Sequence, residues 1–330
     1  MRERVYHGRY MKWCATLILC VTWSSTTGQG HWDDRTLYTT LLHQTSARTA
    51  NDIRVIERRS DGARILLMDD VPQSGVLWNV PDQFGNSICA RLPVSIYPYA
   101  EALQMGLAFL NRNPVRILLL GQGAGVVAMQ MAMRFPQAHI DIVELDPLIS
   151  EIAASKELFP GLRCAAKRRI STTLHVEDAR GFMARAQGTW DLIIIDVFQG
   201  LSVPSFFQSG SFAQSLRRAM RVDGVAVMNV ISFVGRDLIT RDNWVARTHV
   251  ATVRSVLPSV CSFVVPDDSS AAAMTSTNNK EDLDEGRLRN VIIIASRASV
   301  TSEEDACRRT TSLRDPVIVQ KMMIDGPLPW

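Results

Sequence analysis

Short apolar runs alternate with helix-like patterns through the middle of the chain. The apolar runs end at glycine, proline or acidic residues, as buried parallel strands do, and they lie at residues 115–120, 140–144, 173–176, 190–195 and 224–231. The segments between them have apolar positions at helical spacing, at residues 126–135, 147–159, 182–187 and 211–220. Because strand and helix alternate, the pattern predicts a doubly wound α/β fold with helices on both faces of a parallel sheet.

A small β layer is predicted before this region, at residues 52–94. Residues 53–56 and 65–68 have the composition of strands and are joined by a turn at residues 60–62, which predicts a hairpin. The preceding residues, 29–51, are polar and follow no period, so we expect an irregular or partly helical lead-in.

The main domain is predicted to span residues 95–296. It begins with a helix over residues 97–110 and ends with strands at residues 261–265 and 291–295, the last expected to run antiparallel beside the one before it. Residues 267–287 are polar and low in complexity, which predicts a mobile loop. The tail, residues 297–330, shows no clear period.

The first 28 residues differ in composition from the rest. Basic residues precede a short apolar run at residues 13–23, and small polar residues follow it, as in a secretory signal peptide. The run is too short to cross a bilayer, so we expect no transmembrane span there. The alternative is an amphipathic or disordered leader on a cytoplasmic protein, and the sequence leaves both open.

Composition adds two exclusions. Lys and Arg number 36 and Asp and Glu 33, a net charge of +3, which is too balanced to favour nucleic acid as a partner. The cysteines lack metal-ligand spacing, so we expect no metal site. Cys89, Cys164, Cys261 and Cys307 remain beyond the leader, and they are compatible with two disulfides or with four free thiols.

The candidate chemistry starts at the glycine-rich turn after the first strand of the main domain. Gly121, Gly123 and Gly125 let the backbone turn sharply and approach a ligand, and the Gly-x-Gly-x-Gly spacing favours S-adenosylmethionine over a dinucleotide. Glu144 ends the next strand, and its carboxylate is a candidate to accept hydrogen bonds from the two hydroxyls of a ribose. The alternative is a turn that only packs strand on helix, beside an acid favoured by a helix dipole.

Two further acids follow strands of the same predicted sheet. Asp178 is a candidate for binding the adenine amino group, and its alternative is a helix cap. Asp196 follows the most apolar strand and is the candidate catalytic group, which would hold an amine and take its proton. Its alternative is a structural bond at the strand end. Asp146, just before Pro147, is better explained as an N-cap.

The order of these motifs resembles the spermidine synthase superfamily. The matching segments are residues 117–125 (Ile-Leu-Leu-Leu-Gly-Gln-Gly-Ala-Gly), 143–146 (Val-Glu-Leu-Asp), 175–178 (His-Val-Glu-Asp), 191–196 (Asp-Leu-Ile-Ile-Ile-Asp) and 223–230 (Asp-Gly-Val-Ala-Val-Met-Asn-Val). The resemblance implies a class I S-adenosylmethionine-dependent transferase with a Rossmann-like sheet and a small N-terminal β layer. It also implies that Gln73, Glu144, Asp178 and Asp196 are cofactor or catalytic positions, that Tyr99 is a wall of the site, and that the protein is a homodimer.

Two positions depart from the aminopropyltransferases of that superfamily. Ala124 stands where they have an Asp that holds the cofactor amine, and Gln199 stands where they have a second Asp for the diamine. Loss of a charged hydrogen-bond partner costs about 1.5 to 3 kcal/mol. Other segments resemble instead the spermidine-synthase-like methyltransferases, including the C-terminal domain of methyltransferase-like protein 13. These segments are residues 196–198 (Asp-Val-Phe), 203–204, 211–212 and 228–230.

From these matches we expect a methyltransferase that uses S-adenosylmethionine to methylate an amine acceptor, either a small molecule or a protein. One alternative is a polyamine aminopropyltransferase that uses decarboxylated S-adenosylmethionine. The other is a non-catalytic nucleoside-binding module of the same fold.

Overall fold

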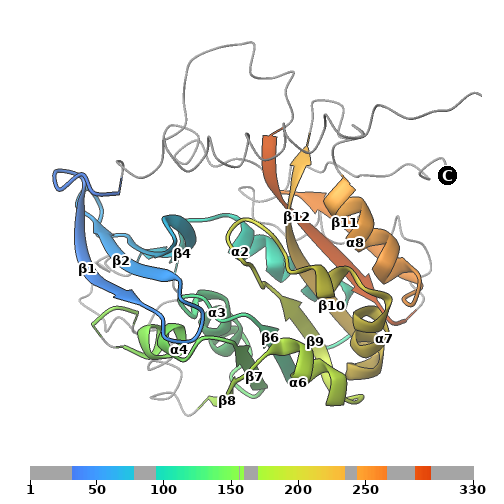
Figure 1. The fold of residues 1–330 in the computed structure, drawn as a ribbon. Helices are drawn as coiled ribbons and strands as arrows, with labels where there is room; N and C mark the ends of the chain where they lie inside the picture. Colours follow the sequence, from blue (N-terminus) through green and yellow to red (C-terminus); the bar gives the residue numbers. More distant parts are fainter. Residues whose placement is uncertain are drawn as a thin grey trace, which may run out of the picture.

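The chain folds into two β-sheets that lie side by side, the second covered by helices (Figure 1). The computed structural model describes residues 32–77, 94–155, 157–159, 170–234, 244–265 and 287–298. The predicted leader, most of the predicted mobile loop and the tail beyond residue 298 lie outside these residues. In the described part, none of the helices is long and apolar enough to cross a membrane.

The N-terminal sheet is an antiparallel meander in the order β1-β2-β3-β4-β5. Its strands are β1 Tyr38–Thr45, β2 Asp52–Arg58, β3 Arg64–Met68, β4 Val71–Leu77 and β5 Val94–Ser95. The pairing of β2 with β3 confirms the predicted hairpin.

The expectation of an irregular lead-in at residues 29–51 is wrong, because β1 occupies much of it. This strand lies at the sheet edge and is mostly solvent-exposed, and its register on β2 shifts between Thr40 and Leu42. It is held mainly by backbone hydrogen bonds, so its side chains lack the alternation that marks a half-buried strand.

The second sheet has seven strands in the order β11-β12-β10-β9-β6-β7-β8. Their bounds are β6 Arg116–Leu120, β7 His139–Glu144, β8 Ser171–Val176, β9 Trp190–Ile195, β10 Met220–Val234, β11 Ser259–Val264 and β12 Arg287–Ser296. Five neighbouring strands, from β10 to β8, are parallel. The last strand, β12, lies antiparallel between β10 and β11, which confirms its predicted direction.

Helices cover both faces of this sheet, as the doubly wound pattern predicts (Figure 1). They are α2 Tyr99–Ala102, η2 Leu103–Phe109, α3 Val126–Arg134, α4 Pro147–Ala154, α6 Ala179–Arg185, η3 Ser205–Gln208, α7 Gly210–Ala219 and α8 Trp244–Arg254. The predicted helix over 97–110 is therefore a short α turn followed by the 3₁₀ helix η2. The predicted helix over 147–159 ends at Ala154.

Two apolar layers flank the second sheet. On one face, η2 and α3 pack against Ile117, Ile194 and Val227; on the other, α6, α7 and α8 pack against alternate strand residues. Gly106 lets η2 lie close on β10, because a Cβ there would stand 2.1 Å from Cγ2 of Val227.

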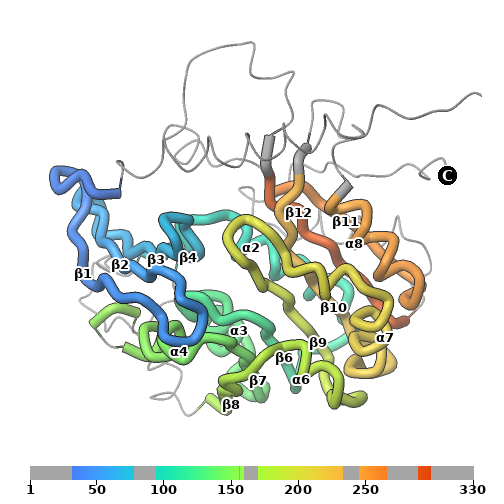
Figure 2. Tube along the Cα trace, viewed as in Figure 1, coloured from blue at the N-terminus to red at the C-terminus, as the bar shows by residue number. Residues whose placement is uncertain are grey.

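A third apolar cluster joins the two sheets. It brings Ile53 and Leu66 of the N-terminal sheet against Ala124 of the glycine turn, Val126 of α3 and Ile152 of α4. Figure 2 shows the same arrangement, with β1 to β4 beside α3 and α4. The N-terminal sheet is therefore packed directly on the turn that carries the candidate ligand site.

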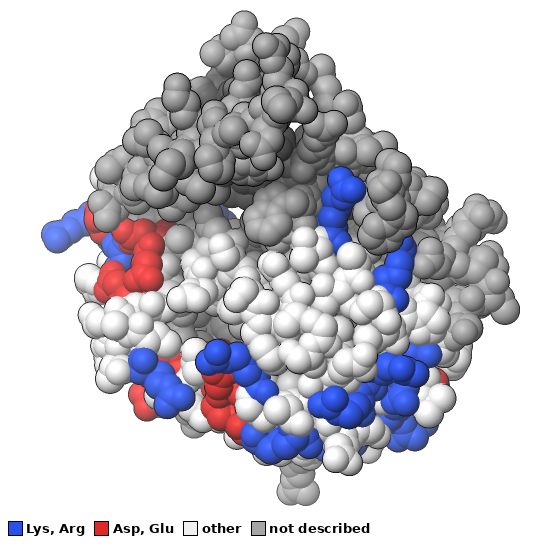
Figure 3. All heavy atoms as spheres, turned by 45° about the vertical axis from the view of Figure 1, so that its right-hand side comes forward, with Lys and Arg blue, Asp and Glu red and all other residues white. Residues whose placement is uncertain are grey.

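Two further features concern the surface and the cysteines. Uncharged residues occupy the middle of the described part of the face shown in Figure 3, and both basic and acidic side chains lie along its margins. Cys261 on β11 is disulfide-bonded, so the interpretation of four free thiols is wrong for this cysteine.

Candidate functional site

The glycine turn between β6 and α3 requires its glycines. Gly121, Gly123 and Gly125 have φ angles of 87°, 50° and 76°, in the region that other residues rarely adopt. A Cβ at Gly121 would lie 2.2 Å from the backbone oxygen of Asp196, and one at Gly123 would lie 3.3 Å from Oγ of Ser74. The turn is thus in close contact with the end of β9 on one side and with β4 on the other.

Glu144, at the end of β7, is held against this turn by backbone donors. The N–H of Gln122 donates to Oε2 at 2.9 Å, and the N–H of Asp146 donates to Oε1 at 3.0 Å. Burial nevertheless raises the pKa of Glu144, since desolvation outweighs these bonds. A carboxylate has about four lone-pair directions, so the group can still accept a hydrogen bond from a ligand.

Asp196 follows β9 at the same edge of the sheet, and Asn229 of β10 is its side-chain partner. Nδ2 of Asn229 donates to Oδ1 of Asp196 at 3.0 Å. Burial raises the pKa of Asp196 to about 6, against a smaller opposing effect of this hydrogen bond. An acid with that pKa is ionised at neutral pH and can still take up a proton.

Tyr99 and Gln73 bring the N-terminal sheet into the site. The hydroxyl of Tyr99 on α2 donates to the backbone oxygen of Gln73 on β4 at 2.9 Å. Burial raises the pKa of Tyr99 well above its usual value, and the nearby charge of Asp196 acts in the same direction. Tyr99 therefore lies close enough to Asp196 for the charge of that carboxylate to affect the pKa of the Tyr99 hydroxyl.

Asp178 is engaged differently from the other predicted site residues. It caps α6, because its Oδ1 accepts from the N–H of Arg180 at 2.8 Å, and its carboxylate also pairs with the Arg180 guanidinium. These bonds lower the pKa of Asp178. The structure thus shows the capping alternative, and the adenine contact stays a prediction. The N-cap expected at Asp146 is confirmed, since Oδ1 accepts from the N–H of Leu148.

The structure brings most of the predicted residues together and adds two that sequence reasoning missed. The glycine turn adjoins Glu144 and Asp196, while Gln73 and Tyr99 meet beside them. The missed residues are Ser74 and Asn229. The signal for Asn229 was a single amide in the middle of an apolar strand that follows the Asp196 strand in sequence. Within the described residues no group of three potential ligands could hold a metal ion.

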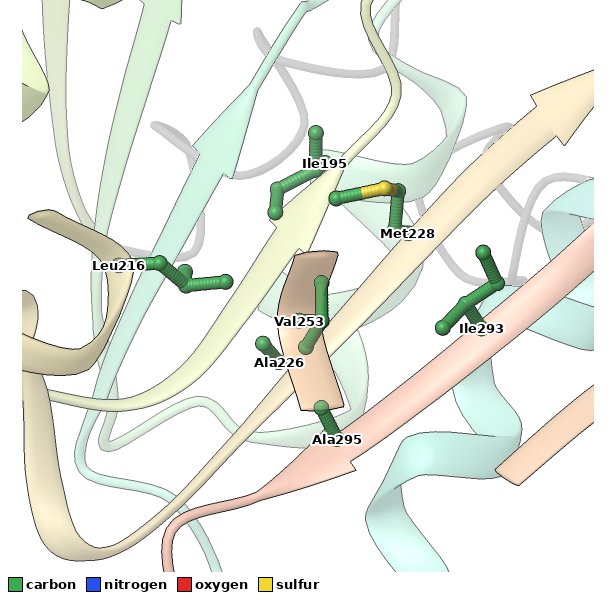
Figure 4. A pocket seen from close by; sticks show the side chains of 7 residues that line it. All are labelled: Ile195, Leu216, Ala226, Met228, Val253, Ile293 and Ala295. Atoms are coloured by element: carbon green, nitrogen blue, oxygen red, sulfur yellow. The ribbon is translucent and has the colours of Figure 1, made fainter. Parts of the chain in front are cut away.

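The cavity in Figure 4 is separate from this site. It lies in the apolar layer under α7 and α8, and its lining is Ile195, Leu216, Ala226, Met228, Val253, Ile293 and Ala295. All seven side chains are apolar, so this is a packing gap rather than a polar ligand site.

Known proteins with similar sequences are polyamine-forming enzymes by name. A polyamine aminopropyltransferase of Vibrio vulnificus is 31% identical over 194 residues, which cover 57% of this chain and 59% of that protein. Spermidine synthase 1 of Pisum sativum is 32% identical over 115 residues, 34% of this chain and 33% of that one. The chain therefore matches less than two thirds of the length of either relative.

A solved structure shows the same fold. A probable spermidine synthase from Corynebacterium glutamicum superposes with a TM-score of 0.56 at 20% identity, covering 82% of this chain and 86% of the other. At that identity the likeness supports the fold, including the Rossmann-like sheet and the N-terminal β layer.

These relatives contradict the methyl transfer expected from the sequence. Their names favour aminopropyl transfer, which was the alternative. The absence of an acid at position 124 had favoured S-adenosylmethionine, but the structure gives another reason for Ala124. This residue is 1% exposed and packs in the apolar cluster between the two sheets. The absence of an acid there reflects packing of the glycine turn on the N-terminal sheet and does not identify the cofactor.

The family assignment rests on a match to a sequence profile. The sequence profile of the spermine/spermidine synthase domain matches residues 97–267. That segment exceeds half of the chain and contains the glycine turn, Glu144 and Asp196. The chain belongs to the spermine/spermidine synthase domain family.

Proposed function

We propose that the protein is an aminopropyltransferase that moves the aminopropyl group of decarboxylated S-adenosylmethionine to an amine. The observation that carries this proposal is the position of Asp196: its backbone contacts the glycine turn, and among the described residues its half-buried carboxylate is hydrogen-bonded only to the neutral amide of Asn229. The names of the related proteins support the same reaction.

The residues around the glycine turn fit a nucleoside. The carboxylate of Glu144 is held by the backbone N–H groups of Gln122 and Asp146 and would accept a hydrogen bond from the ribose. The positive φ angles and absent side chains of the glycines let the ligand approach the backbone. Gln73 and Tyr99 would form the opposite wall, and Asp178 would stand at the adenine end.

The cofactor would supply a carbon activated by attachment to a sulfonium. Asp196 would accept a hydrogen bond from the attacking amine and orient its nitrogen toward that carbon. The lone pair of the nitrogen would form the new C–N bond while the electron pair of the breaking C–S bond goes to sulfur, and Asp196 would take the proton from nitrogen and pass it to water. Positioning can supply roughly 7 to 11 kcal/mol of such a barrier, and a general base adds about 10² to 10⁴-fold.

The loop after Asp196 would give the acceptor amine an uncharged environment. Residues 197–208 contain no ionisable side chain, and Gln199 is exposed to solvent. The acceptor is therefore proposed to be an amine held mainly at one end, at Asp196.

The test is product formation by the full chain. The protein is incubated with decarboxylated S-adenosylmethionine and putrescine, and spermidine and 5′-methylthioadenosine are measured by mass spectrometry. We expect both products, and a rate about 10² to 10⁴-fold lower for Asp196→Asn. Equal rates for the two proteins, or no thioether product with putrescine or with a panel of simple amines, would refute the proposal.

A further inference from the structure

Asn229 has a buried amide oxygen without a hydrogen bond. The side chain is 1% exposed and its Nδ2 donates to Asp196. Within the part of the chain that the structure describes, Oδ1 of Asn229 has no partner. Buried amide oxygens are nearly always paired in native proteins, so an unpaired one beside a candidate catalytic acid requires an explanation.

The orientation of this amide follows from its partner. A carboxylate only accepts hydrogen bonds, so the NH₂ end of Asn229 must face Asp196. Rotating the amide by 180° would place two acceptor oxygens against each other. The carbonyl oxygen of Asn229 is therefore fixed as an acceptor and cannot satisfy itself by exchanging ends.

Asn229 lies on the ligand side of the sheet. Ile195 pairs in register with Met228, so Asp196 and Asn229 are the next residues on neighbouring parallel strands. Asn229 lies on the same face of β10 as Val225 and Val227, which belong to the layer covered by η2. Tyr99, on the adjoining α2, senses the charge of Asp196. The unpaired oxygen thus belongs to a side chain that is bonded to Asp196, on the sheet face that η2 covers.

We propose that Oδ1 of Asn229 is a second acceptor for the substrate amine, so that the site binds protonated amines with at least two N–H groups. This inference rests on the proposed function, since it assigns the amine to Asp196. One N–H is donated to Asp196 and another to Asn229. The nitrogen then stays anchored by Asn229 after Asp196 has taken a proton. Primary and secondary ammonium ions satisfy both acceptors, and a tertiary one, with a single N–H, leaves one buried acceptor unpaired.

A positioning role alone would act differently. If Asn229 only held Asp196 in place, its removal would weaken all amines by the same factor. If Oδ1 binds the amine, removal weakens only those amines that have a second N–H to donate. A series of amines that differ in the number of N–H groups therefore separates the two roles. The added methyl groups also change affinity through their size, and this effect is removed by comparing the variant with wild type for the same amine.

The experiment is a calorimetric titration of the full chain saturated with 5′-methylthioadenosine. The probes are butylamine, N-methylbutylamine and N,N-dimethylbutylamine, and the proteins are wild type, Asn229→Leu and Ser232→Ala. Ser232 is a matched control, because it is also 1% exposed on β10 but lies on the opposite face, where its hydroxyl accepts from the N–H of Ala246. We expect wild type to bind the tertiary amine about tenfold or more weakly than the secondary one.

In Asn229→Leu that difference should disappear, because the primary and secondary amines lose about tenfold in affinity and the tertiary amine loses little. Ser232→Ala should keep the wild-type pattern. A difference that persists in Asn229→Leu, an equal loss for all three amines, or no binding of butylamine to wild type would overturn the inference. Asn229→Ser provides a smaller substitution if the Leu variant does not fold. Because the readout is binding, absence of aminopropyl transfer would refute the proposed function and leave this test intact.

Discussion

Replacing Asp196 by Asn should make the protein more stable while it removes activity. Burial raises the pKa of this carboxyl from 3.8 to about 6. The difference, about 2.2, corresponds at 1.36 kcal/mol per pKa unit to about 3 kcal/mol. That is the free energy by which the ionised carboxylate destabilises the folded state at neutral pH. An Asn at this position has no charge to desolvate and can still accept from Asn229.

The pH dependence has a definite sign. Between about pH 4 and pH 6 the folded protein holds a proton at Asp196 that the unfolded chain has released. Stability contributed by this group therefore falls as the pH rises through that window. The advantage of Asp196→Asn should be near 3 kcal/mol at pH 7.5 and less than about 1 kcal/mol at pH 4.

The assay is urea unfolding of wild type and Asp196→Asn at both pH values, with Asp191→Asn as control. Asp191 is the second residue of β9, the strand that Asp196 follows, but its carboxylate accepts from the backbone N–H groups of Val115 and Arg116. Removing its charge should destabilise the protein by about 1 to 3 kcal/mol. If Asp196→Asn is less stable than wild type at pH 7.5, or its effect is the same at pH 4, the assigned environment of Asp196 is incorrect.

Three further predictions concern the ligand site and the core. Glu144→Gln should weaken 5′-methylthioadenosine binding about tenfold or more by calorimetry, whereas Asp178→Asn should change it little because Arg180 already engages that carboxylate; equal effects would contradict the assignment. Gly121→Ala should cost more than about 3 kcal/mol in urea unfolding, since it adds a clash with the Asp196 backbone to backbone strain, while Gly200→Ala, at φ 62° with nothing near its Cβ, should cost about 1 kcal/mol; similar losses would argue against the close approach. Leu216→Ala should lower stability by about 2 to 5 kcal/mol by enlarging the apolar gap of Figure 4, and a loss below 1 kcal/mol would show that the helix collapses into it.

Local pattern predicted the strands of the main sheet well, because each buried strand is a short continuous apolar run. The run at residues 190–195 is β9, and all six of its residues are buried. What pattern could not supply is pairing between distant segments. The insertion of β12 between β10 and β11 joins residues far apart in sequence, and β1 is held by backbone bonds that leave no mark in its side chains.

In the candidate site, too, local pattern predicted some residues, and contacts between distant segments determined the others. Acids after parallel strands were expected at one edge because such strands share their carboxyl ends, and Glu144 and Asp196 do adjoin the same turn. Asn229 was missed because its importance depends on a neighbour 33 positions away in sequence. Ala124 was interpreted as a missing ligand contact, although its burial between the sheets makes it a packing residue.

The environments of the acids at this edge identify the one suited to chemistry. Asp146 and Asp178 cap helices, and Glu144 is fixed by two backbone N–H groups. Asp196 differs, because among the described residues its side chain is bonded only to the neutral amide of Asn229. Hydrogen bonds from a cation or from several backbone N–H groups stabilise the ionised form of a carboxylate and oppose the effect of burial, as they do in part at Glu144. Asp196 has only a single neutral donor against that effect, so burial raises its pKa to about 6 and its carboxylate can take up a proton. The fold tolerates the destabilising charge of Asp196 at the point where the glycine turn allows closest approach, which is where an attacking amine would need a base.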